Sequence, residues 1–142
     1  LKQIVSWAQR PFILKGIMTA RGAEKALEAG ASGIVVSNHG GRVLDHCPAT
    51  AEVLPDIVDA VGGKMTIFVD GAIRSGMDMF KALALGADAV LIGRPFVTTV
   101  YGGGEEGVQL YVQKLKAELA DTMRMCGAHS LADIDRSMVY GF

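Results

Sequence analysis

The sequence predicts an α/β fold in which four parallel strands alternate with helices, and three observations support this prediction. Short runs of apolar, often β-branched residues recur along the 142-residue chain, at residues 12–14, 33–36, 65–69 and 89–92. A segment with apolar residues at helical spacing follows each run. The runs are continuously apolar rather than alternating, which is typical of a parallel sheet covered by helices.

Local signals indicate where the helices begin and end. Thr19 can cap the first helix, and Thr50 starts the second. A fourth, long helix begins at Glu105, where acidic residues complement the helix dipole, and a glycine run at residues 102–104 separates it from a short helical piece. The first three helices each end at glycine, and their expected ranges are residues 19–29, 50–61 and 76–85.

The sequence also contains an internal repeat. Residues 30–37 (GASGIVVS) match residues 86–93 (GADAVLIG) at an offset of 56, and residues 12–16 (FILKG) match residues 67–71 (IFVDG) at an offset of 55. A strand–helix unit therefore takes roughly 28 residues, close to the ~30 residues of a unit in a (β/α)8 TIM barrel. We expect half of such a barrel, in one domain over residues 1–142. A doubly wound sheet is the alternative, but no G-x-G-x-x-G follows any strand.

Composition and charge limit the partners that we expect. The chain has 14 basic and 15 acidic residues and a net charge of -1, which gives no indication of nucleic acid or membrane binding. Cys47 and Cys126 lie in no metal-ligand spacing, so we expect no metal site. No signal peptide and no apolar run of the ~20 residues needed to span a membrane is visible. We therefore expect a cytoplasmic protein.

Polar residues stand at the end of every predicted strand. In a barrel, functional residues gather where strands end and the following loops begin. A histidine can take a proton near neutral pH, and an arginine can grip a carboxylate with two parallel hydrogen bonds. Taken singly, Lys15 could be an ordinary surface lysine and His39 an ordinary loop histidine, but their common rim favours function. The rim residues are Lys15, Ser37, His39, Arg42, Asp70, Arg74, Gly93 and Arg94.

The last two loops predict a phosphate site. They contain residues 70–76 (DGAIRSG) and Gly93-Arg94, after strands that would be the seventh and eighth of a complete barrel. In such barrels phosphate groups are commonly held there by backbone N–H groups and a helix N-terminus. Arg74 and Arg94 would neutralise the phosphate charge. Two tight turns with solvated arginines are the alternative interpretation.

Together these motifs resemble the C-terminal half of the FMN-dependent α-hydroxy acid oxidase and dehydrogenase family, which includes lactate oxidase and glycolate oxidase. The resemblance covers nearly the whole chain and corresponds to the fifth to eighth strand–helix units. Its most specific motif is residues 37–42 (SNHGGR). The motifs at residues 70–76 and 93–95 (GRP) also occur in other FMN barrels, such as the flavin-type isopentenyl diphosphate isomerase, which is therefore an alternative.

The resemblance implies FMN-dependent oxidation of a lactate-like L-2-hydroxy acid to the 2-oxo acid. It implies that His39 is the active-site base and that Arg42 binds the substrate carboxylate. Lys15 is similar to the family lysine beside the flavin N1/O2 edge, where a positive charge favours anionic reduced flavin. Ser37 is expected to touch FMN. The residues that resemble the phosphate and ribityl site are Asp70, Gly71, Ala72, Ile73, Arg74, Gly93 and Arg94.

Two features depart from the family pattern. Ala72 stands where many members have glycine, and alanine is strained there if the position needs a positive φ. The first half of the barrel, which in the family supplies further flavin contacts, a second substrate arginine, a tyrosine and an aspartate that orients the histidine, does not occur in this sequence.

The missing half leads to two expectations and one alternative. The isolated chain should give little or no turnover, because the base lacks its orienting aspartate. It should form a homo-oligomer or associate with another half barrel through exposed strand edges. A non-catalytic half barrel that binds FMN or phosphate is the alternative to an enzyme.

Overall fold

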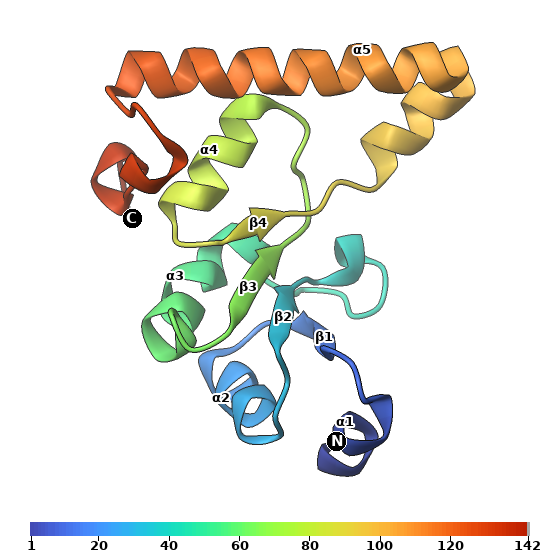
Figure 1. The fold of residues 1–142 in the computed structure, drawn as a ribbon, viewed down its shortest axis with the longest axis vertical. Helices are drawn as coiled ribbons and strands as arrows, with labels where there is room; N and C mark the ends of the chain where they lie inside the picture. The colour runs from blue at the N-terminus through green and yellow to red at the C-terminus, as the bar shows by residue number, and fades with distance from the viewer. Residues whose placement is uncertain (142) are drawn as a thin grey trace.

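The computed structural model describes residues 1–141. Its four strands form one parallel sheet in the order β1-β2-β3-β4 (Figure 1). The strands are β1 (Ile13–Ile17), β2 (Gly33–Val36), β3 (Thr66–Val69) and β4 (Ala89–Val90). The helices are α1 (Lys2–Ala8), α2 (Ala20–Glu28), α3 (Thr50–Val61), α4 (Gly76–Ala84) and α5 (Arg94–Cys126). A helix thus connects each strand to the next, and the predicted alternation of strands and helices is confirmed.

Neighbouring strands in the sequence are also neighbours in the sheet. Ile34 of β2 pairs in parallel with Leu14 of β1 and with Ile67 of β3, and Val69 pairs with Val90 of β4. A sheet that winds in one direction from strand to strand is what a barrel requires, whereas a doubly wound sheet reverses its order. β1 and β4 each pair on one side only, so both are edge strands.

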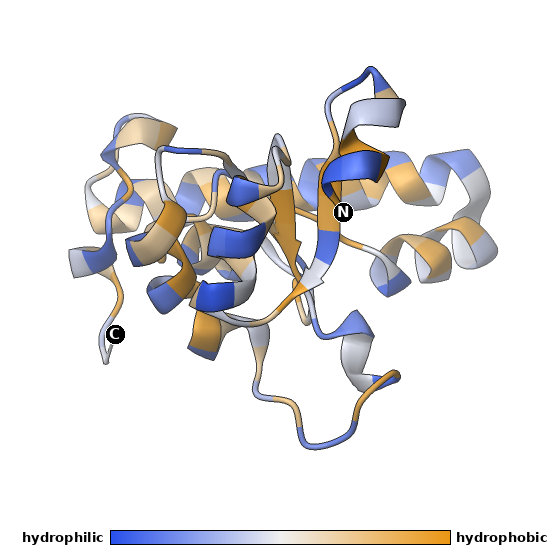
Figure 2. Cartoon of the chain, turned by 90° about the horizontal axis from the view of Figure 1, so that it is seen from below, coloured by the Kyte–Doolittle hydropathy of each residue, from blue (hydrophilic) through white to orange (hydrophobic). Residues whose placement is uncertain are grey.

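The main hydrophobic core lies between the sheet and helices α2 and α3. Ile34, Val36 and Ile67 alternate along their strands and are at most 1% exposed within this core. The strands are among the most hydrophobic segments, whereas the helices carry hydrophilic residues on one side (Figure 2). On the other face of the sheet, Ile13 is 47% exposed. The helices therefore cover one face, as in a half barrel.

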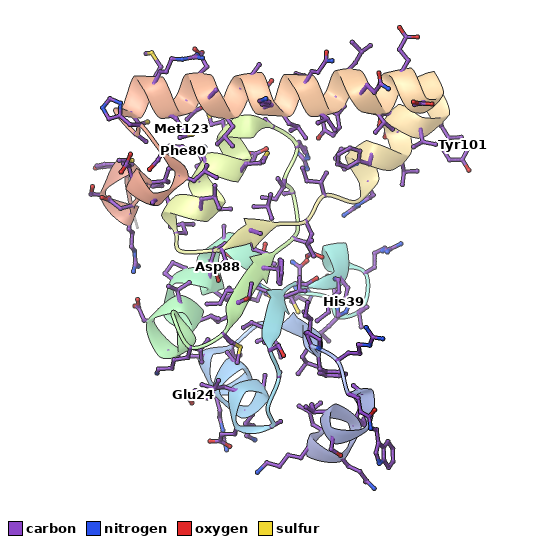
Figure 3. All side chains as sticks on the ribbon, viewed as in Figure 1. Glu24, His39, Phe80, Asp88, Tyr101 and Met123 are labelled. Atoms are coloured by element: carbon purple, nitrogen blue, oxygen red, sulfur yellow. The ribbon has the colours of Figure 1, made fainter. Side chains whose placement is uncertain are left out.

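A second, smaller cluster holds α5 against α4. It contains Phe80 and Ala84 of α4 with Ala128 and Ile134 of the C-terminal segment, and Met123 of α5 packs against it. Phe80 and Met123 lie between the two helices, and α5 runs across the outer side of α4 (Figure 3). The C-terminal third of the chain thus packs mainly on the last strand–helix unit.

The helix starts predicted from Thr19 and Thr50 agree largely with the structure. The Thr19 side chain accepts a hydrogen bond from the N–H of Gly22, and α2 begins at the next residue. α3 begins at Thr50, but the hydroxyl of Thr50 donates to the carbonyl of Asp70 at 2.7 Å and so ties this helix to the end of β3.

The chain reverses its direction at the glycine run. Gly104 has φ 55° and ψ -138°, so the chain turns back inside α5 and forms a helical hairpin (Figure 1). A Cβ built on Gly107 would lie 2.5 Å from the carbonyl oxygen of Thr99, so the two arms are in close contact.

Three details differ from the predictions. The first arm of α5 begins at Arg94, directly after the last strand, rather than near residue 96. Helix α1 was not predicted, and it buries no side chain. β4 is shorter than predicted, because its partner β3 ends at Val69, which pairs with Val90. None of the helices in residues 1–141 combines the length and apolar character that crossing a membrane requires.

Candidate active site

The strand ends and the loops that follow them border one hollow of about 910 Å³. It brings together nearly all the residues that the sequence singled out. The predicted residues that line it are Lys15, His39, Arg42, Asp70, Gly71, Ala72, Ile73, Arg74, Gly93 and Arg94. Ser37 does not line the hollow, because its side chain is 1% exposed and lies beneath it.

Lys15 connects the ends of the first three strands. Its ammonium lies 2.8 Å from Oδ2 of Asp70 and donates a hydrogen bond to Oγ of Ser37 at 2.7 Å. The same Oγ accepts from the N–H of His39 at 3.1 Å. Ser37 therefore fixes the lysine and the backbone of the histidine from below. The lysine remains accessible, since its side chain is 45% exposed.

His39 stands near the ends of β1 and β2 (Figure 3). Its ring lies against the backbone of Gly16. A Cβ built on Gly16 would lie 2.6 Å from Cε1 of the imidazole, and Gly16 has φ +97°. Only glycine fits this position without strain. His39 itself has φ +57°, an uncommon conformation that is concentrated at functional sites. The Asn38 side chain stabilises this turn by accepting from the N–H of Gly40 at 3.1 Å.

The loop after β4 reaches the loop after β2. Nη2 of Arg94 approaches the carbonyl oxygen of Gly40 at 3.4 Å, and a Cβ built on Gly40 would lie 2.6 Å from the same nitrogen. Arg42 follows this turn and is exposed at the border of the hollow. A guanidinium in this place is free to bind a carboxylate.

The phosphate loop shows which backbone groups are available to a ligand. The N–H groups of Arg74 and Ser75 donate to Oδ2 of Asp78, at 3.0 and 3.1 Å, and that of Gly76 donates to Oε2 of Glu118 at 2.9 Å. This hydrogen bond from Gly76 is the main reason that the pKa of Glu118 is lowered. The N-terminus of α4, expected to hold phosphate, is therefore occupied by the protein's own carboxylates.

The preceding residues offer the free donors. Within residues 1–141, the N–H groups of Gly71, Ala72 and Ile73 donate to no protein acceptor. Ala72 has φ +59°, so the alanine is in the left-handed region, where it is strained relative to glycine. Oδ1 of Asp70 is buried and has no hydrogen-bond partner in the described part of the chain.

This set of groups fits a phosphorylated cofactor that carries hydroxyl groups. Free N–H groups and two guanidinium groups suit a phosphate. The unpartnered oxygen of Asp70 can accept a hydrogen bond from a hydroxyl, because an ionised carboxylate is an acceptor only. The ammonium of Lys15 can face a ring edge that becomes negatively charged. The residues thus meet the requirements of FMN.

Comparison with known proteins identifies the family. The family model described as FMN-dependent dehydrogenase matches residues 1–141. The chain belongs to this family. It is 48% identical to a peroxisomal (S)-2-hydroxyacid oxidase of Arabidopsis thaliana over 134 residues, which cover 94% of the chain and 37% of that relative. It is 46% identical to a 2-hydroxyacid oxidase of Dictyostelium discoideum, over 99% of the chain and 36% of the relative. The chain thus spans little more than a third of the length of the curated relatives it matches.

Solved structures agree with this assignment and with the half barrel. A crystal structure of mandelate oxidase with benzoyl-formic acid is 44% identical and has a TM-score of 0.91, with 95% of this chain and 40% of that chain covered. A structure of a mandelate oxidase mutant, with the same identity and TM-score and 43% of that chain covered, carries a monooxide FMN adduct. The alternative of a different FMN barrel, such as an isopentenyl diphosphate isomerase, is therefore wrong.

One expectation about location is also wrong. Three relatives, two from Arabidopsis thaliana and one from Oryza sativa, are named peroxisomal oxidases, which contradicts the expectation of a cytoplasmic protein. Composition does not distinguish the two locations, because import into peroxisomes depends on a short signal read by a receptor.

Sequence reasoning missed several residues that shape the hollow. Asn38 and Thr50 line it and fix the loops after β2 and β3 through their side chains. Gly16 and Gly40 have no side chain and so leave room for the side chains of His39 and Arg94. The glycines stood next to the selected residues and could have been found as points of close approach. The role of Thr50 depends on a contact 20 residues away, for which the sequence holds no signal.

Proposed function

We propose that the protein containing this chain oxidises a lactate-like L-2-hydroxy acid to the 2-oxo acid with FMN, and that residues 15–94 form one half of its active site. The observation that best supports this is the position of His39, whose imidazole packs against Gly16 at the border of the hollow. The base therefore shares this hollow with Lys15, the group suited to the flavin edge, and with Arg42.

In this proposal the chain's own residues bind and deprotonate the substrate. Arg42 holds the substrate carboxylate through two parallel hydrogen bonds, which orients the 2-carbon toward His39. The imidazole of His39 accepts one proton from the substrate, and FMN, when bound, would accept the two electrons as a hydride or as an electron pair. Loss of one proton and one hydride equivalent converts the hydroxy acid into the 2-oxo acid.

The remaining residues of the hollow hold the cofactor. Lys15 contributes positive charge at the reacting ring, and its ion pair with Asp70 fixes the direction of the ammonium. The free N–H groups of residues 71–73, together with Arg74 and Arg94, bind the phosphate. Asp70 accepts a hydrogen bond from a ribityl hydroxyl through Oδ1. Ser37 acts from below by fixing Lys15 and His39, rather than by direct contact with FMN.

Substitutions in the purified protein test these roles. We expect His39→Gln to lower kcat by roughly 10²–10⁴-fold, because general base catalysis is lost, while the absorbance of bound FMN remains. We expect Arg42→Lys to act mainly on KM, since a lysine cannot grip a carboxylate at two points. His46→Gln is the matched control, because His46 lies seven residues along the same loop with its side chain 94% exposed. A His39→Gln variant with unchanged turnover would refute the assignment of the base.

For the 142-residue chain alone we infer little or no turnover. In the described part of the chain, the histidine that pairs with a carboxylate is His46, and His39 has no such partner to stabilise its protonated form. The test is an assay of 2-oxo acid formation from L-lactate with added FMN. A rate near that of a complete hydroxy acid oxidase would contradict this inference.

The unpaired edges of β1 and β4 support association of the chain with another half barrel or with a second copy of itself. Light scattering of the purified chain tests this part of the proposal, and a stable monomer would contradict it. The non-catalytic alternative, a module that binds FMN but does not react, would show flavin binding together with no turnover in the complete protein as well.

A further inference from the structure

Tyr111 of α5 contacts the loop after β3 and the first turn of α5, which directly follows the loop after β4. Its hydroxyl donates a hydrogen bond to the carbonyl oxygen of Arg74 at 2.8 Å. Its ring packs edge-on against Phe96, with ring centroids 5.1 Å apart and an angle of 73° between the planes. Phe96 lies two residues after Arg94. We propose that Tyr111 is a positioning residue that holds the two phosphate-binding loops of the FMN site at a fixed distance from each other.

The hairpin of α5 makes this double contact possible. The first arm starts at Arg94 and carries Phe96, and the second arm carries Tyr111. The arms are reversed at Gly104 and pressed together at Gly107, where a Cβ would meet the Thr99 carbonyl. Tyr111 therefore approaches the loop after β3 from the outside while it remains packed on the segment that follows β4.

The hydrogen bond from Tyr111 adds to the contacts that fix the backbone of the loop after β3. Asp78 holds the N–H groups of Arg74 and Ser75, and Glu118 holds that of Gly76. Tyr111 holds the carbonyl of Arg74, which belongs to the same peptide unit as the Ser75 N–H. Fixing this peptide at both ends also restrains residues 71–73, which line the hollow and whose N–H groups donate to no protein acceptor in the described part of the chain. Partial burial raises the pKa of Tyr111, so its hydroxyl stays protonated and remains a donor at neutral pH.

The proposal rests on the proposed function, because it assumes that these loops hold the FMN phosphate. It predicts that Tyr111 matters for the phosphate and not for the rest of the flavin. The test compares Tyr111→Phe with the unchanged protein, after bound flavin has been removed, by titration with FMN and with riboflavin, which lacks the phosphate. Tyr111→Phe keeps the ring contact with Phe96 and removes only the hydroxyl. Tyr101→Phe is the matched control, since it removes the same group from a tyrosine of α5 that is 90% exposed and points outward (Figure 3).

We expect Tyr111→Phe to weaken FMN binding about three- to tenfold, the effect of one uncharged hydrogen bond, and to leave riboflavin binding unchanged. Phe96→Leu, which keeps the hydroxyl and removes the ring contact, should act in the same direction. Equal weakening of both flavins would mean a merely structural role and would overturn the proposal, as would no change for either. If the unchanged protein bound riboflavin as tightly as FMN, the phosphate site itself would be wrong. If it preferred FMN and Tyr111→Phe kept that preference in full, only the role of Tyr111 would be refuted.

Discussion

The substitution Gly76→Ala sets two opposing effects against each other at the first residue of α4. Alanine is the better helix former, and replacing glycine with it inside a helix stabilises by roughly 0.5–1 kcal/mol. However, a Cβ built on Gly76 would overlap the backbone nitrogen of Leu119 and lie 2.6 Å from the carbonyl oxygen of Leu115, both in α5. Real Cβ atoms essentially never come closer than 3.0 Å to another heavy atom.

Packing should outweigh propensity at this position. Both atoms that the methyl group would meet belong to backbone, so neither can turn aside as a flexible side chain can. Overpacking of this kind costs about 1–3 kcal/mol, and moving the helices apart also lengthens the hydrogen bond between Gly76 and Glu118. After the gain in propensity is subtracted, we expect Gly76→Ala to lower the free energy of unfolding by about 1–2 kcal/mol.

Urea unfolding followed by far-ultraviolet circular dichroism measures this change. With a slope of about 1–3 kcal/mol per molar urea, the midpoint should fall by roughly 0.3–2 M. Gly103→Ala is the matched control, because Gly103 is also in a helix and a Cβ there would meet nothing within 4 Å. It should leave stability unchanged or raise it slightly. If Gly76→Ala proved as stable as Gly103→Ala, the close packing of α4 on α5 would be refuted.

Three further predictions concern charge, backbone strain and the position of the base. The hydrogen bond from the Gly76 N–H lowers the pKa of Glu118. The ionised carboxylate therefore stabilises the fold above its ordinary pKa of about 4.3, and this stabilisation is lost as the pH falls. Glu118→Gln should accordingly flatten the acid side of a curve of unfolding free energy against pH. Ala72→Gly should tighten FMN binding in a fluorescence titration, because it removes both the strain at φ +59° and a methyl group from the loop; unchanged affinity would contradict this. Gly16→Ala should displace the ring of His39 and lower kcat at least tenfold with FMN still bound, and a normal kcat would show that the close contact is not needed.

The fold could be predicted largely because its signals are local. A strand–helix unit is visible in a short window, as Thr19 and the glycine run before Glu105 show. The rim residues could be predicted because the ends of parallel strands meet at one edge of a sheet. The contact between Tyr111 and Arg74, in contrast, joins residues 37 positions apart and depends on the reversal at Gly104. The sequence contains a tyrosine at helical spacing there, which indicates a core position and nothing about its hydroxyl group.

The same limit explains the phosphate loop. The sequence shows a glycine-rich turn followed by a helix, which predicts a helix N-terminus open to an anion. Asp78 is close enough in the sequence to be recognised as a capping residue, but Glu118 lies 42 positions away from Gly76. Which N–H groups remain free for a ligand is therefore decided by packing of α5, which local reasoning does not include.

The separation of the two hydrophobic clusters divides the molecule into units that can open independently. α5 and the C-terminal segment rest on the small cluster around Phe80, whereas β2 and β3 belong to the large one. Amide hydrogens of α5 should therefore exchange with solvent through a local opening that leaves the sheet intact. Because Tyr111 and Glu118 lie on α5, such an opening would release the phosphate loop before the sheet unfolds. Bound FMN should then slow amide exchange throughout α5, far beyond the residues that it touches.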